Sequence, residues 1–233
     1  MTIIDIHTHA YTRKYLEILR EQGGEYGLKI RPDGFEEIFR GETPVAFPQP
    51  GHFDYDVRIK QMADTGIDMS IVSLTCPNVY WGAKNTSILA AEESNNAMAE
   101  AQTAYPERLR WFTSLPWEYP DAAIEELERS CALGAVGVMV LANVAGRSLT
   151  DAFFAPVWAE IDRRKLPVLL HPTDPPGATV MDMGEFDLSW AVGFMFDTTL
   201  AITRMIFTGF FDRYPNLKLI ASHGGATLPY LVG

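Results

Sequence analysis

The chain has 233 residues, of which 47% are hydrophobic, and a formal net charge of −11. This length and composition are typical of a globular protein with a sizeable core, and the negative charge argues against nucleic acid or an anionic membrane surface as the main partner. The N-terminus has no basic and apolar leader pattern, and no apolar run reaches membrane-spanning length. Because Cys76 and Cys131 are too few and too far apart for a disulfide framework, we expect a cytoplasmic protein with free thiols.

The first predicted element is a buried strand at residues 2–9 that ends in His-x-His. Side chains two residues apart on a strand share a face, so His7 and His9 point the same way, with Asp5 one step deeper. Two imidazoles on one rigid strand can both reach a divalent metal. Taken alone, the motif equally fits two histidines that only form hydrogen bonds at a strand end.

A helix is predicted at residues 12–21, and a long irregular stretch follows at about 22–53. This stretch is rich in Gly and Pro, and its length is typical of a functional loop or lid rather than a linker. Within it, residues 35–39 have the spacing of a single helical turn.

From residue 54 the chain alternates between helices and short apolar strands. The predicted helices are 54–63, 86–105, 121–133, 151–164 and 188–207, and the predicted strands are 69–74, 109–113, 136–141, 167–170 and 217–221. Asp54 or Asp56 is expected to cap the first of these helices, and Gly66 to end it. Glu125 and Arg129 are spaced for a charge pair on the third, and one more helix begins near residue 226.

Six successive βα units with strands that are apolar on both faces predict an α/β fold with a parallel sheet covered on both sides. The sheet is either open and doubly wound or closed into a barrel. No glycine-rich phosphate loop follows the first strand, which argues against a dinucleotide-binding fold.

Four of the five histidines lie at or just past the carboxyl ends of predicted strands one, five and six: His7, His9, His171 and His223. In a (β/α)8 barrel these ends converge on the face that carries the active site. Topology would therefore bring residues that are distant in sequence to one pocket. The fifth histidine, His52, lies in the Pro-rich insertion; it could reach the mouth of the pocket, but a solvated loop position is the stronger expectation.

Residues 5–9 (DIHTH), 167–172 (PVLLHP), 222–225 (SHGG) and 229–233 (PYLVG) resemble the amidohydrolase superfamily. More narrowly, they resemble the amidohydrolase-2 branch with aminocarboxymuconate semialdehyde decarboxylase and related non-oxidative decarboxylases. Residues 53–64, 190–199 and 211–218 are also similar to that branch.

The resemblance implies a (β/α)8 TIM barrel that binds one divalent metal, usually zinc and sometimes manganese or magnesium. It implies that the metal ligands are His7, His9 and His171. It also implies that His223 is the acid/base histidine beside the metal-bound water.

The sequence departs from the family pattern in two places. The family's late aspartate ligand, after the eighth strand, has no counterpart, because only about six βα units are present. We therefore expect residues 1–233 to form a single barrel domain that is incomplete at its C-terminus. The aminocarboxymuconate enzyme also presents a substrate-binding arginine in the insertion, whereas no arginine lies between Gly41 and Val57 here.

The function that the resemblance favours is metal-dependent removal of CO2 from a small aromatic or unsaturated carboxylic acid. The same metal site would serve a hydrolase of a lactone or amide, and an inactive truncated barrel is a third alternative. A histidine such as His223 can exchange a proton near neutral pH in either reaction. The resemblance and the apolar surface expected at 190–207 also predict a homodimer.

Four other residues are candidates for supporting roles. Trp190 and Trp81 either wall an aromatic substrate pocket or pack in a core or interface. Asn143 follows the fourth predicted strand and so faces the site end of the sheet. Asp197 either orients a histidine as a supporting carboxylate or is an ordinary helix acid.

Overall fold

The computed structural model describes residues 1–32, 34–175, 177–178 and 180–231. Its main sheet has six strands. In sheet order they are β1 (Ile4–His9), β5 (Met69–Ser73), β6 (Leu109–Ser114), β7 (Gly137–Leu141), β10 (Pro167–His171) and β11 (Lys218–Ala221). All neighbouring pairs are parallel. Because the strand order follows the chain order without a reversal, the sheet is not doubly wound.

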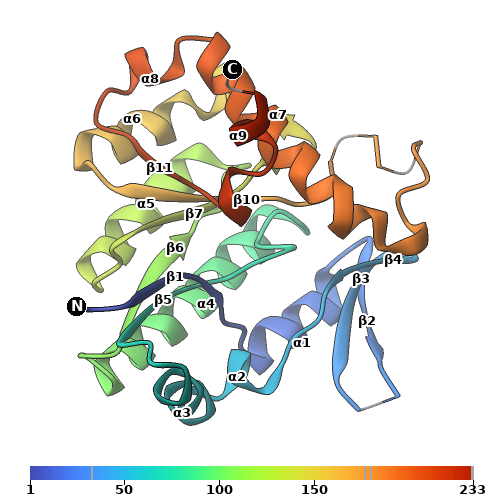
Figure 1. The fold of residues 1–233 in the computed structure, drawn as a ribbon, viewed down its shortest axis with the longest axis vertical. Coiled ribbons are helices and arrows are strands. Elements are labelled where there is room, and N and C mark those ends of the chain that lie inside the picture. Colours follow the sequence, from blue (N-terminus) through green and yellow to red (C-terminus); the bar gives the residue numbers. More distant parts are fainter. Residues whose placement is uncertain (33, 176, 179, 232–233) are drawn as a thin grey trace.

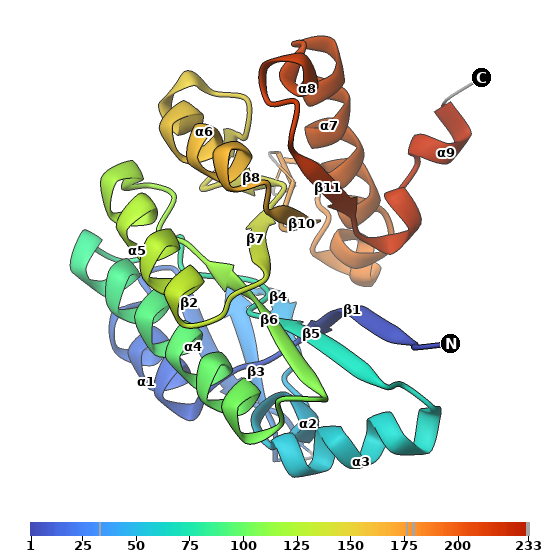
Figure 2. The same cartoon turned by 90° about the vertical axis from the view of Figure 1, so that its left-hand side faces the viewer.

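The sheet follows an arc, with helices along its outer side (Figure 2). The helices between its strands are α1 (Arg13–Gln22), α2 (Pro50–Phe53), α3 (Tyr55–Thr65), α4 (Lys84–Ala104), α5 (Pro120–Ala132), α6 (Ala155–Arg164), α7 (Phe194–Phe207) and α8 (Phe210–Arg213). β1 and β11 are the two edges of the arc, and they are not paired with each other in the described residues. The arrangement is that of a partial (β/α)8 barrel with six units, as predicted.

The middle of the arc is its most deeply buried part. Every residue of β7 is buried, and so are Val168, Leu169 and Leu170 of β10. Gly137 allows the close approach of these two strands, since a Cβ added there would lie 2.5 Å from the carbonyl oxygen of Pro167. This rigid centre fixes the carboxyl ends of the strands, on which the candidate site is built.

The insertion differs from its prediction. Residues predicted to be irregular form an antiparallel three-stranded sheet of β2 (Tyr26–Ile30), β3 (Glu36–Arg40) and β4 (Thr43–Ala46), which projects beside α1 (Figure 1). The prediction of a helical turn at 35–39 was wrong, because β3 forms there and pairs with a strand on each side. Ile38, at the centre of β3, is fully buried. The short local pattern cannot distinguish such a strand from a helical turn.

Most helix ends lie close to their predicted positions. The Asp54 side chain caps α3 by accepting the backbone N–H groups of Asp56 and Val57, and Gly66 ends that helix in the left-handed conformation. The predicted helix 188–207 begins instead as a π-helix at Ser189–Gly193 before α7. Other short elements lie at Asn143–Val144 (β8), Arg147–Ser148 (β9), Ala152–Phe154, Glu185–Asp187, His223–Gly225 and Leu228–Leu231 (α9).

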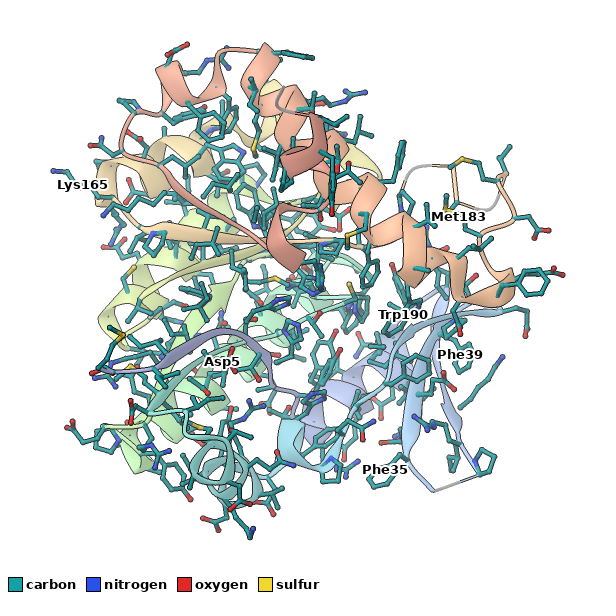
Figure 3. The ribbon with its side chains drawn as sticks, in the orientation of Figure 1. Asp5, Phe35, Phe39, Lys165, Met183 and Trp190 are labelled. Atoms are coloured by element: carbon teal, nitrogen blue, oxygen red, sulfur yellow. The ribbon has the colours of Figure 1, made fainter. Side chains whose placement is uncertain are left out.

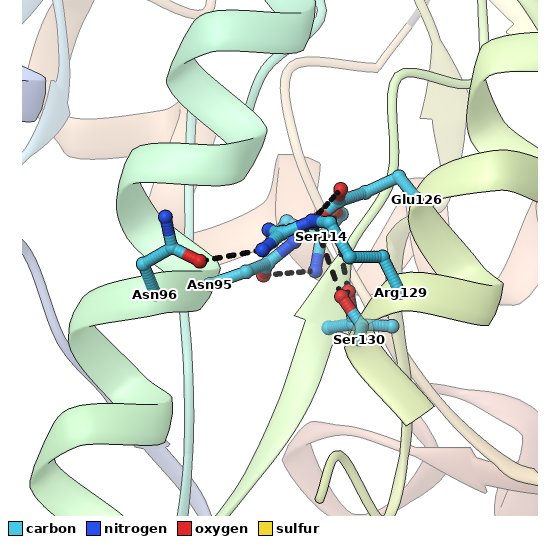
Figure 4. Close-up of polar contacts among 7 residues, drawn as sticks. Asn95, Asn96, Ser114, Glu126, Arg129 and Ser130 are labelled. Carbon is cyan, nitrogen blue, oxygen red and sulfur yellow. Dashed lines mark hydrogen bonds and ion pairs between the residues drawn. The ribbon is translucent and has the colours of Figure 1, made fainter. Parts of the chain in front are cut away.

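A buried polar network joins α4, β6 and α5 (Figure 4). Arg129 pairs with Glu126, with an Nε–Oε2 distance of 2.7 Å, and not with Glu125 as predicted. Glu126 in turn accepts a hydrogen bond from Asn95, whose side chain also bonds the backbone of Ser114. Both glutamates lie about one helical turn from Arg129. The ion pair forms with Glu126, which faces the interior and is only 5% exposed.

The described part of the chain ends in a short helix. The helix predicted from about residue 226 is the single turn of α9, and residues 232–233 of the segment 229–233 lie outside the described residues. None of the helices described here has the length and apolar content needed to cross a membrane.

Candidate metal centre

Four histidines from three strand ends meet at one face of the sheet. His7 and His9 end β1, His171 ends β10, and His223 follows β11. The ring of His7 has its centroid 5.1 Å from that of His9, 5.1 Å from that of His171 and 4.9 Å from that of His223. The rings of His9 and His171 are 4.8 Å apart, and those of His171 and His223 are 5.3 Å apart. The parallel topology thus places all four rings in one small volume.

The arrangement of ring nitrogens fits a divalent cation. Nitrogen atoms of His7, His171 and His223 lie within 4.8 Å of one another. His9 stands beside this group, with its ring next to those of His7 and His171. Imidazole nitrogens are common ligands of zinc and of other divalent transition metals. The rings of His7 and His171 both neighbour those of His9 and His223, so either of these two could complete a set of three imidazoles with them.

Hydrogen bonds orient two of the rings. Nδ1 of His9 lies 3.2 Å from Oγ of Ser73 on the neighbouring strand β5. Nδ1 of His171 lies 2.8 Å from the carbonyl oxygen of Pro172, so it carries the proton and the neutral ring has its lone pair on Nε2. Such partners fix the tautomer and the direction of a metal-ligating imidazole.

Cys76 supports the same carbonyl and is not a candidate ligand. Its Sγ lies 3.2 Å from the carbonyl oxygen of Pro172, which His171 also uses. Burial raises the pKa of the Cys76 thiol to about 12. The thiol is therefore an S–H donor to this carbonyl, and Cys76 is not in the group of side chains whose ligand atoms come together.

The imidazoles are neutral at physiological pH. Burial, followed by the nearby His7, lowers the pKa of His171 to about 3. Burial also lowers the pKa of His9 well below its ordinary value, with the charge of His171 as the next cause. The pKa values of His7 and His223 are lowered too, mainly by burial. Neutral imidazoles present the lone pairs that a metal needs.

A cavity of about 410 Å³ lies against the histidines. One of its walls is aromatic: Trp190 stacks on Phe194 at 5.4 Å and lies 4.8 Å from the ring of Phe47. Trp190 lies between the start of the α7 region and the three-stranded sheet (Figure 3), and its indole N–H donates to the carbonyl of Pro44 at 3.3 Å. The antiparallel insertion thus contributes directly to the cavity, and Trp190 is among its lining residues, as predicted for a pocket wall.

Trp81 lies outside the described lining of this cavity. It is 5% exposed and packs against Tyr15 in the core, and its indole N–H donates to the carbonyl of Asn78 at 2.7 Å. This donor is already satisfied, so we do not keep Trp81 among the substrate contacts.

Asn143 and Asp197 also lie outside the lining and bond to each other. Nδ2 of Asn143 is 3.1 Å from Oδ1 of Asp197, and Oδ2 of Asp197 accepts the backbone N–H of Thr173 at 2.9 Å. Asp197 does not bond a histidine in the described structure, so it supports the segment that follows His171 rather than a ring. Burial raises the pKa of Asp197 to about 7.

The structure adds lining residues beyond the sequence candidates. His52, for which a solvated loop position was the stronger expectation, lines the cavity, together with Tyr11, with Val45 and Ala46 of β4 and with Phe47 just after it. His52 is brought there by the hydrogen bond from the backbone N–H of Tyr11 to its carbonyl oxygen, at 2.9 Å. No local pattern signals this contact, because it joins the end of the insertion to the segment that follows β1.

The family model described as Amidohydrolase matches residues 4–231. The chain belongs to the amidohydrolase family. It is 30% identical, over 99% of its length, to the 2-amino-3-carboxymuconate-6-semialdehyde decarboxylase of Dictyostelium discoideum. Over 76% of its length it is 33% identical to the gamma-resorcylate decarboxylase of Rhodococcus jostii (strain RHA1). It spans 65% and 58% of the lengths of these two amidohydrolase relatives.

A solved structure with the same fold contains a metal ion. It is the D314N mutant of 5-carboxyvanillate decarboxylase from Novosphingobium aromaticivorans DSM 12444, with bound manganese and 3-methoxy-4-hydroxy-5-nitrobenzoic acid. The TM-score is 0.82 at 25% identity, and the match covers all of this chain and 68% of that one. The resemblance inferred from the histidine motifs is therefore confirmed.

Proposed function

We propose that this protein is a divalent-metal-dependent, non-oxidative decarboxylase of a small aromatic carboxylic acid. The observation that carries the proposal is the meeting of four histidine rings, with neighbouring centroids 4.8–5.3 Å apart, at one end of an aromatic-walled cavity. The decarboxylases among its relatives support the choice of reaction.

His7, His9 and His171 would hold the ion, and Ser73 and the Pro172 carbonyl would keep the rings of His9 and His171 in place. When bound, the ion would supply a positive charge that polarises the carboxylate of the substrate. Zinc is our preferred metal because the ligands are imidazoles, and manganese is the alternative that the solved relative supports.

His223 would move the proton. Loss of CO2 breaks the bond between the ring carbon and the carboxylate and leaves an electron pair on that carbon, which a proton must take up. The His223 ring stacks on Phe194, with centroids 5.9 Å apart, and so lies beside the aromatic wall on which a substrate ring would rest. Burial and the nearby His7 lower the pKa of His223, so its resting ring is neutral; it would take up a proton from solvent and pass it to that carbon.

The experiment is an assay of CO2 release from a panel of hydroxybenzoates by the protein loaded with zinc or manganese, with chelator-treated protein as the control. We expect metal-dependent CO2 release from at least one acid. Turnover of a lactone or amide panel without CO2 release would replace the proposal with hydrolysis. A protein that binds metal and turns over neither panel would contradict both.

We also propose a homodimer. Apolar side chains remain exposed on and beside α7: Val192 is 51%, Phe196 43% and Phe207 84% exposed. Exposed apolar side chains close together are typical of an association surface. The mass in solution, measured by light scattering, tests this, and a monomer at micromolar concentration would contradict it.

A reducing compartment such as the cytoplasm fits the two cysteines. Cys76 is buried and Cys131 is half-buried, and both are free thiols. Fractionation of the native cells tests this assignment, and recovery outside the cytoplasmic fraction would contradict it.

A further inference from the structure

The three-stranded sheet of the insertion has an edge strand, β2, that pairs with β3 alone. It is the outermost strand on the right of Figure 1. At the opposite edge, Pro44 of β4 lacks a backbone N–H, and its carbonyl oxygen accepts the indole N–H of Trp190 at 3.3 Å. β2 has no proline to block its edge, and Ile30 at its end is 78% exposed. Such an edge is a template for pairing with another strand.

The register of β2 and β3 identifies the backbone groups at this edge. The pair is antiparallel, and the backbone N–H of Arg31 donates to the carbonyl of Phe35 in the same register. Hydrogen-bonded residues alternate along an antiparallel pair, so the odd-numbered residues of β2 bond β3. The backbone groups of Leu28 and Ile30 therefore point away from β3, and they have no hydrogen-bond partner in the described part of the chain.

We propose that β2 pairs with β2 of a second copy of this chain, antiparallel and in one register. Leu28 would lie opposite Leu28 of the second copy, on the two-fold axis, and Ile30 would lie opposite Tyr26. The free N–H groups of Leu28 and Ile30 would then donate to carbonyl oxygens of the other copy, and the two small sheets would become one. The exposed Ile30 side chain would rest on Tyr26, which packs at the margin of the core.

The other face of β2 favours the same register. Lys29 would lie opposite Gly27 of the second copy, where a Cβ added to the glycine meets no atom within 4 Å, so the lysine side chain has room. Arg31 would lie opposite Glu25, which has the opposite charge. A shift of two residues in one direction places the two Lys29 side chains opposite each other, which is unfavourable. The same shift in the other direction leaves Ile30 with no residue of β2 opposite it.

The association should be weak, because an edge of five residues buries less surface than the ~1,600 Å² of a stable interface. It should therefore depend on concentration. It involves neither the histidine site nor the apolar side chains of α7. Its test is independent of the proposed function and of the homodimer proposed above.

Substitutions at Gly27 test the register by charge. Gly27→Glu places a carboxylate opposite Lys29 of the second copy and should strengthen self-association about 10-fold, because the two-fold axis repeats the new pair. Gly27→Lys places an ammonium there and should weaken self-association about 10-fold. The two variants are matched, since both add a long side chain at the same open position. Sedimentation velocity at increasing micromolar concentrations measures both.

Equal association of the two Gly27 variants, or stronger association of Gly27→Lys, would overturn the proposal. Adding Lys29→Glu to Gly27→Lys restores a pair of opposite charges and should return the association to that of Gly27→Glu. Any dimer that persists in Gly27→Lys reports the α7 contact alone, so the two interfaces are distinguished.

A disulfide test reads the register directly. Leu28→Cys places two thiols at the two-fold axis, where the Cα atoms of opposite residues are about 5.5 Å apart, within the range of a disulfide. Ile30→Cys is the control, because its counterpart in the second copy would be about 14 Å away along the strand. With oxidised glutathione as the oxidant, Leu28→Cys should run as a covalent dimer on a non-reducing gel and Ile30→Cys should not. Equal linkage of the two variants, linkage of Ile30→Cys only, or linkage of neither would overturn the proposal.

Discussion

Arg58 of α3 donates a hydrogen bond to the carbonyl oxygen of His9, and so ties a helix to the strand that presents the His-x-His pair. The same guanidinium donates to Oγ1 of Thr8 at 2.6 Å, and the Arg58 side chain is only 6% exposed. The planar guanidinium holds these two acceptors with N–H groups on separate nitrogens in fixed directions, a geometry that the single ammonium nitrogen of a lysine does not reproduce.

We predict that Arg58→Met lowers the affinity for the metal about 10-fold, because the end of β1 loses its anchor. The matched control is Lys60→Met on the same helix, whose exposed ammonium pairs with Asp64 at 2.6 Å. Metal dissociation constants, measured by competition with a chromogenic chelator, give the comparison. Equal affinities in the two variants would contradict a positioning role for Arg58.

Ser73→Ala should weaken metal binding about 10- to 100-fold, because it removes the hydroxyl that orients the His9 ring. Ser70→Ala is the matched control, since Ser70 lies on the same strand, is buried, and its hydroxyl has no hydrogen-bond partner in the part of the chain that the structure describes. The same chelator competition measures both. A loss of affinity in both variants would point to packing of β5 rather than to orientation of His9.

Single substitutions should distinguish the role of His9 from that of His223. If His9 is a ligand and His223 moves the proton, His9→Ala loses bound metal, whereas His223→Asn keeps it and loses activity by about 10²- to 10⁴-fold. The metal content of each purified variant, measured by elemental analysis, decides the point. Loss of metal from His223→Asn with retention in His9→Ala would assign the third ligand position to His223. The ligands would then be His7, His171 and His223, whose nitrogens lie within 4.8 Å of one another.

The buried carboxyl of Asp197 predicts a pH-dependent stability. Its folded pKa of about 7 lies above the ordinary 3.8, so between these values the folded protein keeps a proton that the unfolded chain releases. The free energy of unfolding should therefore fall as the pH rises through this window, by about 4 kcal/mol in total relative to Asp197→Asn. Urea denaturation of both proteins at several pH values between 4 and 8 measures the difference. A difference that stays constant across the window would show that Asp197 is ionised throughout.

The sequence determined much of the fold because its signals are local. Apolar strands, helix ends such as Asp54 and Gly66, and the regular βα alternation depend on near neighbours, and they predicted the parallel sheet and its six units. The positions of His7, His9, His171 and His223 after strands also followed from the chain alone, because parallel strands bring their carboxyl ends to one face.

Tertiary structure decided the rest, because it depends on contacts between segments distant in the chain. The insertion is a sheet because its strands pair with one another, and this pairing brings Phe47 to the cavity. Packing placed Trp81 in the core and Trp190 in the cavity wall, although the sequence allowed either position for both. The backbone hydrogen bond with Tyr11 holds His52 at the site. The residues around Tyr11 and His52 in the sequence do not predict this bond.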